Sequence, residues 1–415
     1  MTATNASKSS NTTWAFRAKF RRESFGWRGS RLAIERIAEA LTEIRASARH
    51  DPVRAAEGAV LFLERLSPAI CQVDSSSGAL GSAAHAAVGT LVPLIASAPV
   101  SENIRAKWLE RLFEALQEDD PPYLESLGDH WGELCATPAL ASRWADDLLP
   151  MLHRVAQERS KGTFAWFKGT GACYSALFKA GRHGDLLDLL ARNPRPIWHD
   201  LVWGGRVLLA RGEVDAAIEY VNRSGSSYGP QGAVARFAED ALLHAGRTEE
   251  AYAGYAIEAN QAQSRLATYR AIAKKYPQLG TERLMRDLIA STPGNEGKWF
   301  ATAKSLKRFD LASELVWVSP CDPKTLARAA RDHLEDRPAF AMQAAMGALH
   351  WIAAGYGYEI TVADAIEARR LAANAAERTG HIGDFEQWLE QLLASKQPSA
   401  PWLRDCFAKW PSRRS

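Results

Sequence analysis

The feature that most constrains the fold is a spacing that recurs after three glycines. Each glycine is followed, after five and nine residues, by small or apolar residues suited to a helix interface: Gly181 by Leu186 and Leu190, Gly212 by Ala217 and Val221, and Gly246 by Ala251 and Tyr255. Successive glycines are 31 and 34 residues apart, a period typical of helical solenoids. Glycine tolerates the positive φ that reverses the chain at a helix end, and a small residue on the second helix lets two helices approach closely. The pattern therefore predicts an all-α fold built from helical hairpins.

The best copy of this unit resembles a tetratricopeptide repeat. Four residues stand where that motif has Gly, a turn Gly, Ala and a bulky apolar residue: Gly205, Gly212, Ala217 and Val221. Leu201 stands where the motif prefers Trp, and the closing proline is displaced to Pro230. The resemblance implies an α-α superhelix, a solenoid of helical hairpins that is HEAT-like in its N-terminal half and tetratricopeptide-like from about residue 165.

Interruptions of the helical pattern divide the chain into four expected regions. Glycines break the pattern between Lys161 and Gly171, and a second break lies between Ser319 and Pro323. The expected regions are a flexible basic and aromatic arm at 1–31, an N-terminal helical repeat region at 32–160, a tetratricopeptide-like repeat region at 161–320 and a C-terminal helical region at 321–415. No alternating apolar and polar run requires a β-strand.

Four Xaa-Pro pairs predict helix starts. Asp or Thr is a good N-cap, and proline at the first helical position loses no hydrogen bond. The pairs are Asp51-Pro52, Asp120-Pro121, Thr137-Pro138 and Asp322-Pro323.

The composition is that of an ordinary soluble protein, with 47% hydrophobic residues, 24% charged residues and a net charge of +3. No uninterrupted apolar run approaches the ~20 residues needed to cross a membrane, and residues 1–13 lack the apolar block of a secretory signal. The five cysteines are odd in number and form no C-x-x-C pair, which favours reduced core thiols over disulfides or zinc. We expect a cytoplasmic protein without a cofactor.

Patterns that could indicate catalysis have simpler interpretations. Residues 225–229 read Gly-Ser-Ser-Tyr-Gly and match the nucleophile elbow G-x-S-x-G, but a predicted helix rather than a strand precedes them, so a loop between repeats is favoured. Glu125, Asp129 and Glu133 lie four apart on one predicted helix. Because like charges repel, we expect a solvated acidic stripe or a cation opposite it, with a metal as the alternative. No H-E-x-x-H motif or phosphate-binding loop is present.

The N-terminal arm concentrates the basic charge. Residues 1–31 carry seven lysines and arginines against one glutamate, a net charge of +6, and aromatic residues lie between them. Basic side chains neutralise phosphates and aromatic rings stack on bases, which makes five residues candidate nucleic-acid contacts: Arg17, Lys19, Arg21, Arg22 and Arg28. Alternatively, Trp14, Phe16, Phe20 and Trp27 dock on the first helices while the basic groups stay in water.

Three stretches resemble a family of bacterial all-helical proteins of uncharacterised function. They are WAFRAKFRR at 14–22, AVLFLERLSP at 59–68 with VDSSSG at 73–78, and GYGYEIT at 355–361. The resemblance implies a helical fold and a bacterial origin, and it supplies no reaction, ligand or site.

Taken together, these patterns favour a non-catalytic helical-repeat scaffold that binds a protein or peptide partner along a concave face. The candidate contacts are Tyr174, Trp203, Arg206 and Arg236, each of which is equally well explained as interhelix packing or solvated surface. A second hypothesis is a nucleic-acid-associated accessory protein, for example of mobile DNA, that uses the basic arm. A third is an enzyme of unknown type.

Overall fold

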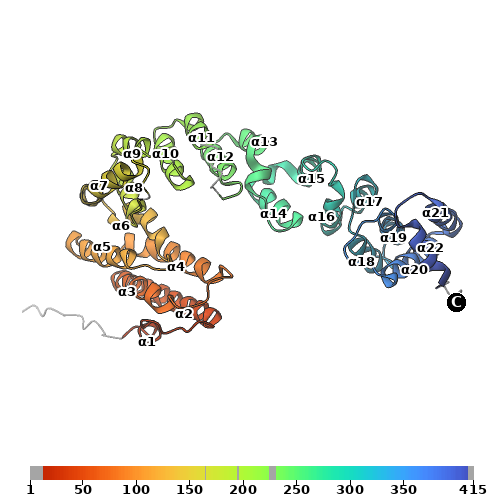
Figure 1. Ribbon diagram of the computed structural model, residues 1–415, viewed down its shortest axis with the longest axis horizontal. Coiled ribbons are helices and arrows are strands. Elements are labelled where there is room, and N and C mark those ends of the chain that lie inside the picture. The colour runs from red at the N-terminus through yellow and green to blue at the C-terminus, as the bar shows by residue number, and fades with distance from the viewer. Residues whose placement is uncertain (1–12, 164, 194–195, 224–229, 410–415) are drawn as a thin grey trace, which may run out of the picture. The chain divides into compact units, whose positions relative to one another are not determined.

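The computed structural model describes residues 13–163, 165–193, 196–223 and 230–409. Within these ranges the chain forms twenty-two α-helices and three short 3-10 helices, with no strand (Figure 1). The all-α prediction is therefore confirmed. The Gly-Ser-Ser-Tyr-Gly sequence at 225–229 lies outside the described residues.

The chain divides into two compact units, Met1–Gly229 and Pro230–Ser415. The division falls inside the 161–320 region that the sequence pattern treats as continuous. The two units are groups of helices that contact one another. The four expected regions rest instead on changes in the sequence pattern, so those regions remain a prediction.

The first unit contains eleven of the described α-helices and one 3-10 helix, η1. Their bounds are α1 Phe16–Lys19, α2 Ser30–Ala48, α3 Pro52–Ile70, α4 Ala79–Ala96, α5 Glu102–Gln117, η1 Glu125–His130, α6 Trp131–Cys135, α7 Pro138–Ser160, α8 Thr170–Lys179, α9 His183–Ala191, α10 Trp198–Ala210 and α11 Val214–Arg223.

The core of the first unit begins with three helices that contact one another, α2, α3 and α4. The short helix α6 then links α4 to α8, and α7 lies along α8. Trp131 on α6 is fully buried and packs edge-on against Trp144 of α7. Each helix thus buries its apolar face against a neighbour in the same unit.

Helix α4 is the one described helix that is long and apolar enough to cross a membrane. The core helix of a soluble protein can pass the same test by length and composition. In α4, 39% of the residues are buried, and the helix contacts both α2 and α3. Ser82, His85 and Thr90 interrupt its apolar character. These contacts are compatible with a soluble protein.

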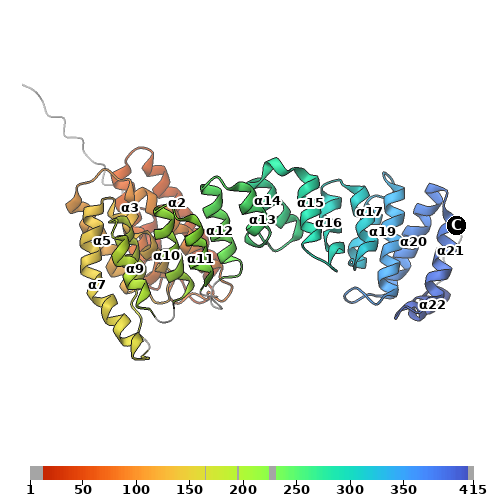
Figure 2. The same ribbon diagram turned by 90° about the horizontal axis from the view of Figure 1, so that it is seen from above.

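The second unit contains eleven further α-helices and two 3-10 helices. Their bounds are α12 Ala233–His244, α13 Thr248–Ala259, α14 Arg265–Lys275, η2 Pro277–Leu279, α15 Gly280–Ala290, η3 Glu296–Trp299, α16 Phe300–Ser305, α17 Phe309–Val318, α18 Pro323–Asp332, α19 Pro338–Ala353, α20 Val362–Thr379, α21 Ile382–Ala394 and α22 Ala400–Lys409. Helices close in sequence pack together, as the group α19 to α22 shows (Figure 2).

Seven described helices end in the same turn. One residue with positive φ donates its N–H to the carbonyl three residues earlier, and the N–H of the next residue donates to the carbonyl five residues before it. This is the Schellman arrangement, which satisfies two carbonyls at the helix end. The turn residues are Gly162, Gly181, Gly212, Gly246, Lys307, Gly355 and Gly380.

The three turns predicted from the spacing are therefore confirmed. The residues that follow Gly212 by five and nine, Ala217 and Val221, are fully buried, as is Ala251 after Gly246. The turn at Lys307 was missed because a lysine replaces the glycine. Its φ is 59°, and Ala312 and Val316 follow it at the same two intervals, both fully buried.

Three of the four predicted helix starts are confirmed. The side chains of Asp51, Thr137 and Asp322 each accept a hydrogen bond from a backbone N–H in the first turn of α3, α7 and α18. The prediction at Asp120-Pro121 is wrong, because Pro121 begins no helix. The neighbouring Asp119, 2% exposed, accepts the N–H groups of Tyr123 and Leu124 instead and leads the chain into η1.

The prediction that Glu125, Asp129 and Glu133 lie on one helix is also wrong. A 3-10 helix ends at His130 and α6 begins at Trp131, so the three carboxylates do not share one helical face. Glu133 pairs with His130, with 3.3 Å between Oε2 and Nδ1. Asp129 does have a cationic partner, as described below.

Replacing glycine with alanine should have opposite effects at two positions of the second unit, one in a left-handed turn and one inside a helix. Gly246→Ala should destabilise the protein by about 1–2 kcal/mol, because alanine disfavours positive φ and the added Cβ meets no neighbour that could change the balance. Gly254→Ala, inside α13 with equally open space around its Cβ, should stabilise it by about 0.5–1 kcal/mol. Lys307→Gly should stabilise it by about 1 kcal/mol. Urea unfolding followed by circular dichroism measures all three, and the same sign for both alanine variants would contradict the account.

Candidate functional site

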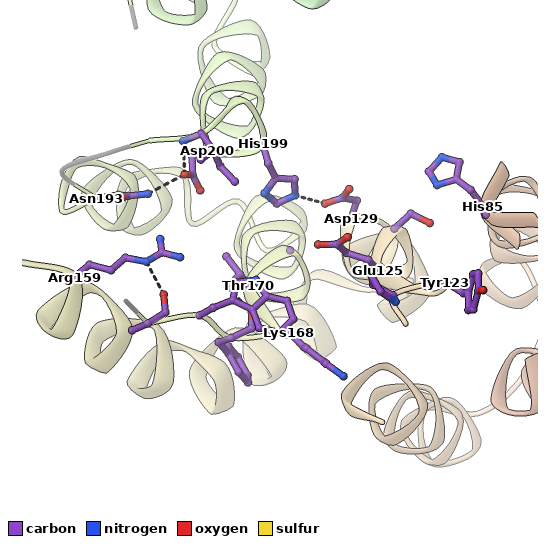
Figure 3. A pocket seen from close by; sticks show the side chains of 18 of the residues that line it. His85, Tyr123, Glu125, Asp129, Arg159, Lys168, Thr170, Asn193, His199 and Asp200 are labelled. Carbon is purple, nitrogen blue, oxygen red and sulfur yellow. Dashed lines mark hydrogen bonds and ion pairs between the residues drawn. The ribbon is translucent and has the colours of Figure 1, made fainter. Parts of the chain in front are cut away.

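The first unit contains a cleft of about 810 Å³ (Figure 3). Its walls come from the start of α4, from η1, from the end of α7 with the segment that leads into α8, and from the start of α10. Residues far apart in the sequence therefore share one cavity, and its size is typical of pockets that hold a small molecule or a short peptide segment.

Close backbone contact holds η1 and α6 against α8. A Cβ added at Gly132 would collide with the carbonyl oxygen of Ser175, and one added at Gly128 would crowd the backbone nitrogen of Ala172. The Ser175 hydroxyl accepts the Gly132 N–H (2.9 Å) and donates to the Asp129 carbonyl (2.8 Å). These contacts fix Asp129 at the edge of the cleft.

Asp129 forms an ion pair with His199 at the start of α10. Asp129 Oδ1 and His199 Nε2 are 2.5 Å apart, and the two side chains are 36% and 35% exposed. The Trp203 indole nitrogen lies 3.4 Å from the same Nε2. Because Nε2 donates its proton to Asp129, it cannot also accept one from the indole, and the indole N–H faces the Asp129 carboxylate instead.

The pair shifts the pKa of both groups. Burial alone would lower the pKa of His199, but the hydrogen bond and the charge of Asp129 outweigh it and the pKa lies above its ordinary value of 6.5. Burial would raise the pKa of Asp129, but the hydrogen bond and charge of His199 outweigh it and the pKa lies below 3.8. Each partner therefore favours the charged form of the other, and Figure 3 shows the pair at the upper side of the cleft.

Asp200 anchors the neighbouring wall. It is 3% exposed and accepts hydrogen bonds from the Tyr174 hydroxyl (3.1 Å), Asn193 Nδ2 (2.8 Å) and the backbone N–H of Ile197 (2.9 Å). The Tyr174 ring stacks on His199, with 5.9 Å between ring centroids. Burial, reinforced by the charge of Asp200, raises the pKa of Tyr174, so its hydroxyl remains a donor.

The opposite walls carry polar groups whose hydrogen-bonding capacity is unused. Arg159 Nε donates to the carbonyl of Ala165 (2.9 Å), and its terminal nitrogens have no partner among the described residues. The exposed Glu125 has no ion pair or hydrogen bond to a described side chain. The Tyr123 hydroxyl and Ser126 Oγ are buried and also lack a hydrogen-bond partner in the described chain.

Lysine and aromatic side chains complete the lining. Lys168 donates to the carbonyls of Gln117 (2.8 Å) and Asp119 (2.6 Å), which ties the segment before α8 to the end of α5. Trp166, 52% exposed, and the half-buried Phe167 provide apolar surface. The cleft thus combines aromatic surface with both signs of charge.

The structure brings three of the four predicted partner contacts together behind this cleft. Tyr174 and Trp203 are buried against His199, and the Arg206 guanidinium lies 4.6 Å from the centre of the Trp203 ring. They support the lining residues and do not themselves line the cleft. Arg236 belongs to the second unit, where it is exposed on α12.

The N-terminal segment docks part of its rings on the first helices. Phe16 and Phe20 lie as the alternative interpretation expects, and Trp27 does not. Phe16 and Phe20 are buried and pack edge-on against Phe62, and Phe25 is also buried. Trp14 is half-buried, whereas Trp27 is 68% exposed. Arg17, Arg21, Arg22 and Arg28 are exposed, and Lys19 pairs with Glu39 at 2.7 Å.

The described residues form neither a disulfide nor a cluster of side chains that could hold a metal ion. All five cysteines are free, and burial raises the pKa of Cys135, Cys173 and Cys321 to about 12. In the ranges that the structure describes, no three His, Cys, Asp or Glu side chains are placed to hold a metal ion.

The sequence interpretation missed His199, Arg159 and Asp200 as members of a site. His199 lies 70 residues from Asp129, and no spacing links them. The one signal for His199 was the acidic group at Asp129, for which the sequence predicts a cationic partner. The sequence pattern does not identify the part of the chain that supplies this partner.

Known proteins provide no further assignment: no family model, curated protein or solved structure matches this chain.

The ion pair predicts the titration of His199. Asp129→Asn should lower the pKa of His199, because burial then acts without the opposing carboxylate. The imidazole resonances of ¹³C-labelled histidine followed by NMR give the value, with His199→Gln to assign the signal. An unchanged titration of His199 in Asp129→Asn would show that the pair does not form in solution.

The same shifts predict a pH window for stability. The raised pKa of His199 gives a contribution that is fully present below about 6.5 and is lost as the pH rises through the folded-state value. The lowered pKa of Asp129 gives one that is present above 3.8 and is lost as the pH falls through its folded-state value. The stability difference between wild type and His199→Gln should therefore be larger at pH ~6 than at pH ~9.

Proposed function

We propose that this chain is a non-catalytic helical-repeat scaffold that binds a peptide segment of a protein partner in the cleft of the first unit. The recurring hairpins support this proposal. Seven described turns share one hydrogen-bonding geometry, and hairpins that repeat in this way stack into α-α superhelices, which present long binding surfaces. The assignments of the hairpins as HEAT-like and tetratricopeptide-like belong to the same proposal.

The observation that carries the proposal is the unused hydrogen-bonding capacity in the cleft. The terminal nitrogens of Arg159 have no partner in the described chain, and the exposed Glu125 has no ion pair or hydrogen bond to a described side chain. A peptide supplies a donor and an acceptor at almost every residue, and its side chains can pack on the aromatic surface of Trp166 and Phe167. A peptide therefore matches the mixed chemistry of the lining better than a purely apolar ligand.

The proposed location is the cytoplasm. The five free cysteines suit a compartment that keeps thiols reduced, and the described helices are compatible with a soluble protein.

A pair of glycines on α4 provides the test of peptide binding. Gly81 lines the cleft and Gly89 does not, and a Cβ at either position has open space around it. The full-length chain is incubated with a pool of random peptides, and the retained peptides are quantified by mass spectrometry after ultrafiltration. We expect Gly81→Trp to reduce retention by about tenfold or more by filling the cleft, and Gly89→Trp to retain as much as wild type. No retention by wild type, or equal retention by both variants, contradicts the proposal.

A second candidate function is nucleic-acid binding through the N-terminal segment. The specific observation in its favour is that Arg17, Arg21 and Arg28 are exposed and have no ion pair or hydrogen bond to a described side chain. Arg22 has one long ion pair, with 3.9 Å between its Nε and Glu23 Oε1. Because most of the neighbouring rings are buried, this function would rest on phosphate contacts, with Trp27 available for stacking.

The salt dependence of binding tests this second function. Replacing Arg17, Arg21, Arg22 and Arg28 with alanine should weaken retention on single-stranded DNA and reduce the slope of log K against log salt by about one per lost contact. A control variant replaces four exposed arginines elsewhere, namely Arg154, Arg211, Arg270 and Arg286. Equal salt slopes for the two variants would remove the N-terminal segment as the DNA contact.

A further inference from the structure

We infer that the cleft selects a ligand that carries both signs of charge, a carboxylate bound by Arg159 and an ammonium or guanidinium bound by Glu125. The inference rests on the proposed peptide-binding function and specifies which peptides bind. It follows from which charged groups in the cleft already have partners and which do not.

Arg159 is a guanidinium held in place with its fork unused. Its Nε is bound to the carbonyl of Ala165 at 2.9 Å, so the side chain is oriented before a ligand arrives. Its terminal nitrogens have no partner in the described chain and face the cleft (Figure 3). Two parallel N–H groups of this kind match the two oxygens of a carboxylate.

Glu125 is the acidic group of the cleft that has no ion pair or hydrogen bond to a described side chain. Asp129 is neutralised by His199, and Asp200 accepts three hydrogen bonds from its own wall. Glu125 has no such partner among the described residues, although it lies close enough to His199 for its charge to contribute to that group's raised pKa. A cationic group of the ligand would provide the missing partner.

The two groups enter the cleft from different elements. Arg159 comes from the end of α7 and Glu125 from the start of η1, and Figure 3 shows them on opposite sides of the cleft. Lys168 also carries a positive charge, but its amine is held by two carbonyls and lies close enough to the buried Asp119 carboxylate to oppose the rise that burial causes in the pKa of that group. A ligand of a single charge would satisfy one of the two groups and face repulsion from the other. A ligand with opposite charges at its two ends satisfies both.

The two charges can come from the free termini of a short peptide or from side chains of an internal segment. Tetrapeptide pools without Lys, Arg, Asp or Glu distinguish these sources when they are prepared with free ends, with an acetylated N-terminus, with an amidated C-terminus and with both ends blocked. A fifth pool has both ends blocked and includes the four charged residues. The full-length chain is incubated with each pool, and retained peptides are quantified by mass spectrometry.

We expect retention only of peptides that carry both charges, from whichever source, and a loss of about tenfold or more when either charge is blocked. Retention of the blocked, uncharged pool at the same level as the others overturns the inference while the peptide-binding function stands. A chain that retains no peptide from any pool overturns both.

Variants of the two groups link the selectivity to the cleft. Arg159→Gln should remove the preference for a carboxylate, and Arg159→Lys should keep part of it, because lysine provides the charge without the fork. Glu125→Gln should remove the preference for a cation. Arg154→Gln on the same helix and Glu118→Gln at the end of α5 are controls of equal charge change outside the cleft, and circular dichroism confirms folding. Equal selectivity in wild type and both glutamine variants at 125 and 159 overturns the inference.

Discussion

The structure depends on a single left-handed residue at the end of a helix. A helix that buries an apolar stripe requires a neighbour, and in this chain the neighbour often follows immediately, because one residue reverses the chain and satisfies two carbonyls at the same time. The φ angles at Gly181, Gly212 and Gly246 lie between 72° and 80°. Hydrogen bonds of the same pattern recur at all three, so the local chemistry of one turn produces a series of similar helical hairpins.

Basic side chains perform a related task in the first unit, because helix C-termini leave carbonyls that need donors. Arg105, 6% exposed, donates to the carbonyls of Ile95, Ala98 and Leu134, and so joins the ends of α4 and α6. Lys168 binds two carbonyls beyond the end of α5 in a similar way. A positive charge is favourable at these positions. The helix ends of the first unit are thus held by contacts between side chains and backbone as well as by hydrophobic packing.

Local features of the fold were predictable from the sequence, and non-local ones were not. The turns at Gly212 and Gly246 can be predicted from the sequence because glycine tolerates positive φ. The equivalent turn at Lys307 carries the same burial pattern with an unfavourable residue, so a search based on glycine overlooks it. The pairing of Asp129 with His199 depends on how η1, α8 and α10 pack, and no spacing in the sequence encodes that distance.

The contrast between two polar clusters separates structural roles from binding roles. Glu239, fully buried in the second unit, accepts hydrogen bonds from Asn260 (2.7 Å), Tyr276 (2.9 Å) and Lys275 (2.5 Å). Such a network is complete, and a ligand could add nothing to it. The cleft of the first unit has the opposite property, because its paired groups, such as Asp129 with His199, stand beside groups that the described fold leaves unpaired.

Leaving a buried polar group unpaired costs about 1–3 kcal/mol. A fold gains nothing in stability from Tyr123 and Ser126 in their present state, although it satisfies Glu239 completely. Unpaired buried atoms also occur away from the cleft, at Arg65, Gln117 and Trp131 in the first unit and at Glu296 and Gln397 in the second. An unpaired atom is therefore a guide to a binding site only where it also faces an open cavity, as the terminal nitrogens of Arg159 do.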